Sequence, residues 1–128
     1  MTAPIEYLDV EDLLRLATVV LGGDPLVRDV GLLEAAAARP AASVFGVDAY
    51  DDLWAKAAAL LQSLVKNHAL VDGNKRSGAV AALLFLELNN IEISAPTGSI
   101  YEQTIAVANG LAGKVELTEF FRDHAVTP

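Results

Sequence analysis

Ala57-Ala-Ala-Leu-Leu-Gln-Ser-Leu64 and Val80-Ala-Ala-Leu-Leu-Phe-Leu86 are the two stretches that decide the fold of this 128-residue chain. The first lies in a segment from Asp51 to about Ala69, whose inward-facing residues recur at helical spacing: Leu53, Ala57, Leu60, Leu61 and Leu64. The second lies in a segment from Lys75 to Asn89 that is so heavily apolar that its helix must be central. The sequence therefore predicts a helical protein built around this pair.

Two helices are predicted before the central pair. Asp9 can cap a helix that ends at Gly22-Gly23, because a carboxylate accepts a free N–H group of the first turn and glycine readily adopts the left-handed stop. Asp29 can likewise cap a shorter helix from Val30 to Arg39. Residues Pro40 to Tyr50 are expected to form a loop, because proline disfavours helical geometry in the residue before it.

Two more helices are predicted after the pair. Ser99, with Glu102 three residues later, has the pattern of a capping box for a helix to about Asn109, and a last helix follows Thr118. Strand-like alternation is limited to two short segments, Ile91–Ile93 and Val115–Leu117. Neither is long enough to found a sheet. We therefore predict an all-α fold, a compact single-domain bundle of about six helices.

Size and composition favour one soluble domain spanning residues 1–128. The hydrophobic share of 53% is sufficient for a core at this length. The longest apolar run, Ala79 to Leu86, is far shorter than the roughly 20 residues that a membrane span requires. The N-terminus lacks the pattern of a secretory signal, and the chain has no cysteine, so we expect a cytoplasmic protein.

The net charge of -8 argues against direct binding of nucleic acid, which requires clustered basic residues. The charge is nevertheless uneven. Between Leu53 and Leu86 there are four positive residues and one negative residue, a net charge of +3: Lys56, Lys66, Asp72, Lys75 and Arg76. A buried helical pair that shows few charges by chance is an equally acceptable explanation of this count on its own.

The connection between the two apolar helices reads His68-Ala-Leu-Val-Asp-Gly-Asn-Lys-Arg-Ser-Gly-Ala79. Gly73 and Asn74 both tolerate left-handed backbone geometry, which lets successive N–H groups form an anion-binding nest. Lys75 and Arg76 stand in the first turn of the next helix, where the helix dipole disfavours positive charge. A bound polyphosphate would reverse this penalty, and such a local conflict is typical of a functional site.

Each of these residues also has a structural explanation when it is taken separately. His68 can interact with carbonyl groups at a helix end, and Asp72 can be the N-cap of the following helix. Gly73 and Asn74 can simply stop a helix, and Lys75 with Arg76 can be a solvated helix end. The combination within nine residues is harder to explain as caps, because it supplies a base, a carboxylate that can hold a divalent metal, a turn and two cations.

This segment resembles the Fic motif, His-x-Phe-x-(Asp/Glu)-Gly-Asn-(Gly/Lys)-Arg, and most closely its Doc (death-on-curing) branch. The residues in register with the motif are His68, Asp72, Gly73, Asn74, Lys75 and Arg76. The resemblance extends upstream through Arg28 to Ala36, and downstream through Leu83 to Leu86 and Asn89, so it covers nearly the whole chain. It implies a compact helical bundle in which the motif loop leads into a buried helix.

The resemblance also implies a role for each motif residue in transferring a phosphate-containing group from ATP to a hydroxyl of a target protein. His68 would take the proton from the hydroxyl, and Asp72 would hold Mg²⁺ against the phosphates. The predicted nucleotide-binding residues are Gly73, Asn74, Lys75, Arg76 and, more remotely, Lys66. Asn74, Lys75 and Arg76 would be catalytic as well, because they stabilise phosphate charge.

Several departures from the motif bear on the reaction. Leu70 replaces the usual phenylalanine as an apolar anchor of the loop. Lys75 stands where adenylyl-transferring Fic enzymes have glycine, and Ala79 stands where they have a second arginine. Both changes favour the Doc branch, whose members are kinases of elongation factor Tu and stop translation. Gly73 is instead the residue of the ordinary Fic motif, where Doc proteins often have alanine, so adenylyl transfer (AMPylation) stays an alternative.

Two further expectations follow from the resemblance. A toxin of this kind belongs to a toxin-antitoxin module, and no stretch of the sequence has the self-inhibiting Fic pattern Ser/Thr-x-x-x-Glu-Gly/Asn, so inhibition should come from another chain. We expect a small antitoxin of the Phd type whose disordered C-terminal segment folds as a helix in an apolar groove. A noncatalytic helical binding module is the alternative of a different class.

Overall fold

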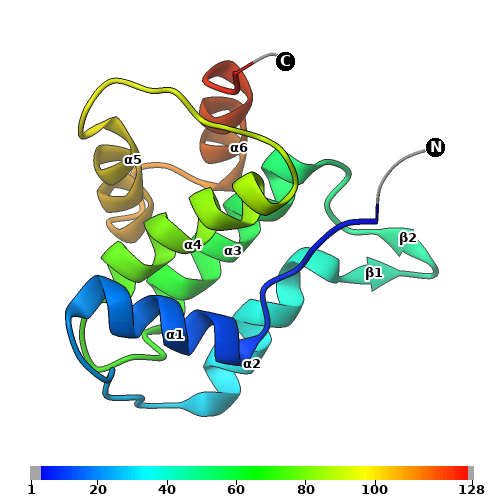
Figure 1. Ribbon diagram of the computed structural model, residues 1–128. Coiled ribbons are helices and arrows are strands. Elements are labelled where there is room, and N and C mark those ends of the chain that lie inside the picture. Colours follow the sequence, from blue (N-terminus) through cyan, green and yellow to red (C-terminus); the bar gives the residue numbers. More distant parts are fainter. Residues whose placement is uncertain (1–3, 127–128) are drawn as a thin grey trace.

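Residues 4–126 of the computed structural model form an all-α bundle of six α-helices, as the sequence predicts (Figure 1). The helices are α1 (Val10–Leu21), α2 (Val30–Ala38), α3 (Leu53–Asn67), α4 (Asn74–Leu88), α5 (Ser99–Ala108) and α6 (Lys114–Asp123). The predicted domain limits at residues 1 and 128 lie outside the described residues. None of the helices within residues 4–126 has the length and apolar character needed to cross a membrane.

The apolar pair α3 and α4 forms the centre of the bundle, as predicted. α1 and α5 pack against α4, and α2 and α6 pack against α3 (Figure 1). Small residues bring the two central helices close together: a Cβ atom on Gly78 would lie only 3.0 Å from Cγ2 of Val65. Because the helices pack so closely, the end of α3 and the start of α4 have a fixed relative position. These two helix ends flank the motif loop.

The caps predicted for the first two helices are confirmed. The carboxylates of Asp9 and Asp12 form a reciprocal capping box at the start of α1, and Gly22 ends it in the left-handed conformation. Asp29 accepts the N–H of Leu32 and caps α2. This helix ends at Ala38, one residue earlier than predicted, and passes into a 3-10 turn, Arg39–Ala41.

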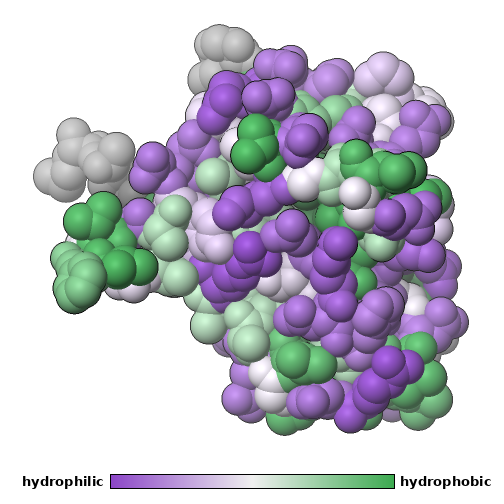
Figure 2. All heavy atoms as spheres, turned by 180° about the vertical axis from the view of Figure 1, so that it is seen from behind, coloured by the Kyte–Doolittle hydropathy of each residue, from purple (hydrophilic) through white to green (hydrophobic). Residues whose placement is uncertain are grey.

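The loop predicted after α2 is partly wrong, because it contains a small antiparallel hairpin, β1 (Ser43–Val44) and β2 (Val47–Asp48). Its tip carries the fully exposed Phe45, whose backbone is left-handed. Seen from behind, the hairpin forms an apolar projection at the edge of the molecule (Figure 2). Strands of two residues are too short to give a sequence signal.

A buried lysine joins this hairpin to the bundle. Only 1% of Lys56 is exposed, and its Nζ donates to the carbonyl of Pro40 at 3.0 Å and pairs with the Asp48 carboxylate at 3.3 Å. Tyr7 covers the ammonium group from the N-terminal segment. Lys56 therefore does not belong to an exposed positive patch, and the charge count from the sequence overstated that patch by one residue.

The starts of the last two helices differ from the predictions. Gly98, and not a Ser99–Glu102 capping box, is the N-cap of α5, and the Ser99 hydroxyl donates to the carbonyl of Pro96. α6 begins at Lys114, four residues before Thr118, so the predicted alternation at Val115–Leu117 is helical.

The early start of α6 has a clear physical cause. The carboxylate of Glu116 accepts the N–H of Gly113 at 2.8 Å, which caps the helix five residues upstream of Thr118. The pKa of Glu116 is lowered because its carboxylate accepts backbone N–H groups of Glu116 itself and of Gly113. Of the predicted extended segment at Ile91–Ile93, a single bridge from Ile93 to Ala125 is formed.

Candidate active site

The motif loop between α3 and α4 is held in place by backbone hydrogen bonds to the segment that connects α1 and α2. The carbonyl of Ala69 accepts the N–H groups of Arg28 (2.7 Å) and Asp29 (3.1 Å), and the N–H of Val71 donates to the carbonyl of Leu26 (2.8 Å). Between these contacts, Leu70 is 3% exposed. Leucine thus anchors the loop in the core, as expected for the residue that replaces phenylalanine.

Asn74 ties the loop to itself. Its side-chain Oδ1 accepts the N–H of Leu70 at 3.1 Å, and its Nδ2 donates to the carbonyl of Leu70 at 2.9 Å. Both ends of the carboxamide are therefore engaged with one loop residue. This geometry gives Asn74 a positioning role that the sequence did not predict, and it leaves the backbone N–H of Asn74 as the group that can meet a phosphate.

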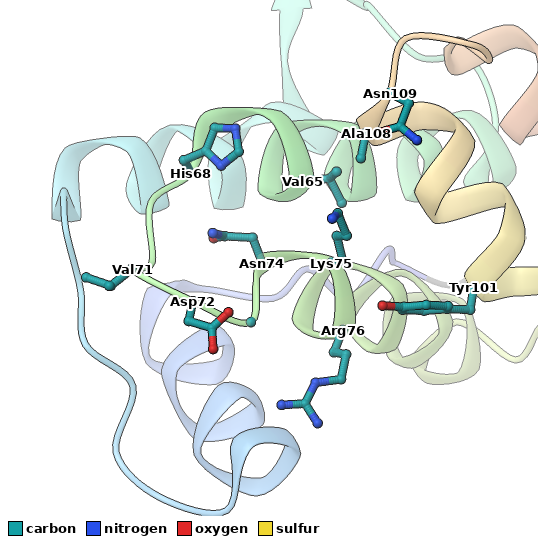
Figure 3. Close-up of a pocket in the computed structure, with 11 residues that line it drawn as sticks. Val65, His68, Val71, Asp72, Asn74, Lys75, Arg76, Tyr101, Ala108 and Asn109 are labelled. Carbon is teal, nitrogen blue, oxygen red and sulfur yellow. The ribbon is translucent and has the colours of Figure 1, made fainter.

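His68 follows the last residue of α3 as its C-cap, rather than lying in the last turn as predicted. Its backbone is left-handed (φ 52°, ψ 43°), a conformation that costs a non-glycine residue free energy and that is common at functional sites. The side chain is exposed and contributes to the wall of a cavity that it shares with the motif loop (Figure 3). His68 is therefore open to a second molecule.

The start of α4 is cationic and has no side-chain cap. Gly73, with φ 84°, is the N-cap, so the explanation of Asp72 as the cap of this helix is wrong. The first turn holds no acidic residue, and it carries Lys75 and Arg76, both exposed. Within residues 4–126, neither cation lies within 4.0 Å of a carboxylate. Unpaired N–H groups and two cations without a carboxylate partner thus gather at the start of α4, which suits an anion.

These groups converge on a cavity of about 480 Å³, the size of a small-molecule pocket (Figure 3). The predicted residues that line it are His68, Asp72, Gly73, Asn74, Lys75 and Arg76. Lys66, also predicted to bind the nucleotide, is exposed on α3 and is not part of this lining. The structure thus brings the motif residues together and leaves Lys66 outside.

The opposite wall of the cavity was not predicted from the sequence. It is formed by Val65 on α3 and by three residues at the two ends of α5: Tyr101, Ala108 and Asn109. The side chain of Lys75 rises from α4 towards Val65 and Ala108 (Figure 3). No local pattern marks the α5 residues, because they reach the motif only through the packing of α5 on α4.

Asp72 is suited to hold a divalent metal together with a phosphate. Its exposed carboxylate lines the cavity and has no ion-pair partner within residues 4–126. No group of three or more acidic or histidine side chains that could hold a metal occurs in the described part of the chain. Mg²⁺ commonly takes one or two carboxylates and completes its shell with water and substrate phosphates, so a single aspartate fits that mode of binding.

Fold and site together define a helical protein that presents an uncapped, cationic helix start beside a histidine and a carboxylate. Residues 7–86 match the model of the Fic/DOC family. The chain is also similar to the curated protein "Toxin Doc" of Mycolicibacterium smegmatis (strain ATCC 700084 / mc(2)155), with 60% identity over 90 residues that cover 70% of this chain and 69% of that protein. The chain belongs to the Fic/DOC family, which confirms the resemblance read from the motif.

The hydrogen bonds of Asn74 give a first prediction. Asn74→Ala removes both partners of the Leu70 peptide groups, at a cost of about 1–3 kcal/mol in the free energy of local opening. We expect hydrogen exchange of the Leu70 amide to speed up by roughly tenfold or more, as followed by NMR. Asn109→Ala, an identical change in the opposite wall, should leave this amide unchanged. Equal exchange of Leu70 in wild type and Asn74→Ala would contradict the tether.

Proposed function

We propose that the protein is a Doc-type toxin of a toxin-antitoxin module, which transfers the γ-phosphate of ATP to a serine or threonine hydroxyl of a translation protein such as elongation factor Tu. The observation that carries this proposal is the uncapped start of α4, which faces a cavity together with exposed His68 and Asp72. The family assignment and the similarity to a protein named as a toxin support it.

The chemistry of the transfer requires a base and a stabilised phosphate. His68 takes the proton of the target hydroxyl while the hydroxyl oxygen forms a bond to the γ-phosphorus. The bond from that phosphorus to the bridging oxygen breaks, and ADP leaves with the electron pair. When bound, Mg²⁺ neutralises phosphate charge beside Asp72. The N–H groups at the start of α4, with Lys75 and Arg76, stabilise the negative charge on the transferred group.

Two features favour transfer of the γ-phosphate over transfer of the adenylyl group. The Lys75 side chain lines the cavity, where glycine would leave space, and its ammonium adds a positive charge there (Figure 3). Ala79 is 7% exposed, lies outside the cavity lining and offers no bidentate donor for a distal phosphate. Gly73, which matches the ordinary Fic motif, is the observation in favour of adenylyl transfer.

The position of the label on ATP distinguishes these reactions. The purified chain is incubated with cell extract, Mg²⁺ and ATP labelled at the γ- or the α-phosphate, and labelled proteins are identified by mass spectrometry. We expect transfer of the γ-label only, and a loss of about 10² to 10⁴ in rate for His68→Ala because the base is removed. His124→Ala is the matched control, because the His124 ring lies outside the cavity. It packs on the Phe120 ring and forms a hydrogen bond with the backbone carbonyl of Phe120.

Each other result selects an alternative. Transfer of the α-label alone would replace the kinase with an adenylyl transferase. Absence of both labels from every protein would favour the noncatalytic binding module. Full activity of His68→Ala would remove His68 from the role of base.

The proposed antitoxin partner requires an apolar groove, and the structure offers one between α1 and α4. This groove of about 320 Å³ has a mostly apolar lining formed by Leu8, Leu16, Val19, Leu84 and Leu88, and its two charged lining residues are Asp12 and Arg15. Val19 is 82% exposed and Leu88 is 46% exposed, so apolar surface is available to a partner. Two neighbouring helices with aliphatic side chains fit the apolar face of a third helix, which is the form expected of the C-terminal segment of a Phd-type antitoxin.

A charge placed in this groove tests the partner. We expect the chain produced alone to arrest growth and its cognate antitoxin to restore growth. Val19→Glu should retain toxicity and escape the antitoxin, because a carboxylate would be buried at the interface. Val115→Glu, an exposed valine on α6 outside the groove, should remain neutralised. Neutralisation of Val19→Glu as efficient as that of wild type would place the antitoxin elsewhere.

A further inference from the structure

The last residue of α1 packs against the reverse side of the phosphate-binding turn. A Cβ atom on Gly73 would overlap Cδ2 of Leu21 and would lie 2.9 Å from its Cδ1 and 3.1 Å from its Cγ. All three of the nearest atoms belong to this one side chain. Leu21 and Gly73 are 52 residues apart in the sequence, and neither the motif nor its spacing indicates the contact.

The turn needs such a support because its own cap does not hold it. Gly73 is left-handed, with φ 84°, and glycine is the residue with the most freedom to leave a given conformation. No side chain caps the N–H groups that follow it. Asn74 fixes the part of the loop at Leu70, and the contact of Leu21 lies beyond that point, where the N–H groups turn towards the cavity.

Leu21 also borders a space behind the turn. A second, smaller cavity of about 200 Å³ lies on this side, and Leu21 lines it together with Asp72 and Arg76, which also line the main cavity. Removing most of the leucine side chain would enlarge this space directly behind the two charged residues. They could then relax away from the main cavity.

The support comes from a rigid element. Leu16 and Ala17, one turn before Leu21, are buried in the core, and the N–H of Gly22 donates to the carbonyl of Thr18 at 3.0 Å, which fixes the end of α1. The position of Leu21 is therefore set by the packing of α1 on α4, independently of the loop that it touches.

We propose that Leu21 is a positioning residue of the active site, which holds the Gly73 turn so that the N–H groups of Asn74, Lys75 and Arg76 face the bound phosphates. This inference rests on the proposed phosphate transfer at the same loop. A site held within a fraction of an ångström by packing from behind loses rate when that packing is removed, although the side chain meets no substrate.

Truncation of Leu21 tests the inference. We expect Leu21→Ala to lower kcat for γ-phosphate transfer by roughly ten- to a hundredfold and to speed up hydrogen exchange of the Gly73–Arg76 amides. Leu21→Met should recover most of both losses, since methionine fills a similar volume. Leu14→Ala is the matched control, because Leu14 is a partly buried leucine on the same helix that packs on the core and lines neither cavity. It should lower the melting temperature and leave kcat unchanged.

A double variant tests the contact itself. Gly73→Ala places a methyl group against Leu21, and Leu21→Ala removes the side chain that it meets. If the contact exists, the double variant is more active than the product of the two single effects predicts. Independent effects of the two substitutions, or an effect of Leu14→Ala on kcat as large as that of Leu21→Ala, would overturn the inference.

The inference and the proposed function fail in different ways. If the unmodified chain neither transfers phosphate nor binds ATP, the proposed function is wrong. Amide exchange at Gly73–Arg76, compared between the unmodified chain and Leu21→Ala, would still decide whether Leu21 holds the turn. Normal transfer in the unmodified chain, with unchanged kcat and amide exchange in Leu21→Ala, would remove the inference alone.

Discussion

The backbone hydrogen bonds between Leu26–Asp29 and Ala69–Val71 are the constraint on which the rest of the site depends. They attach the motif loop to the connection between α1 and α2, so the loop is not a free link between α3 and α4. Because Leu70 is buried beneath this pairing, the flanking polar residues stay at the surface, where they line the cavity. His68 before the paired segment and Asp72 after it are thereby brought to the same opening. Because these hydrogen bonds join backbone groups, they hold the loop whatever side chains it carries, and those side chains are free to serve the site.

A second constraint is electrostatic. The start of α4 combines unpaired N–H groups with Lys75 and Arg76 and has no acidic residue in its first turn. This arrangement is unfavourable for the isolated helix, since like charges meet the positive end of the dipole. It becomes favourable when a polyphosphate binds, because the negative charge of the phosphates relieves the repulsion between the two cations and the helix dipole. Such a local conflict, relieved by a ligand, is typical of a functional site. The chain as a whole is negatively charged, so the cationic area at the start of α4 differs from the rest of the protein. Because Lys56 is buried, the exposed cations of this area are Lys75 and Arg76 of the motif and the nearby Lys66.

Most of the fold and the chemical centre of the site could be predicted from local patterns. The caps at Asp9 and Asp29 are contiguous sequence signals, and the motif places its residues in one short loop. The hairpin at residues 43–48 has two strands of only two residues, which give no periodicity to detect. The other omissions are nonlocal. Tyr101 reaches the cavity through helix packing, and Leu21 reaches Gly73 because α1 ends there; neither contact leaves a trace in residue spacing.

The central claim is that the start of α4 binds the phosphates of the nucleotide. It is tested most directly by a crystal structure of the chain with Mg²⁺ and a nonhydrolysable ATP analogue. The account predicts phosphate oxygens at about 2.7–3.2 Å from the backbone nitrogens of Asn74, Lys75 or Arg76, Mg²⁺ beside the carboxylate of Asp72, and the γ-phosphate as the group nearest to His68. An analogue bound outside this cavity, or bound here with no phosphate at the start of α4, would contradict the account.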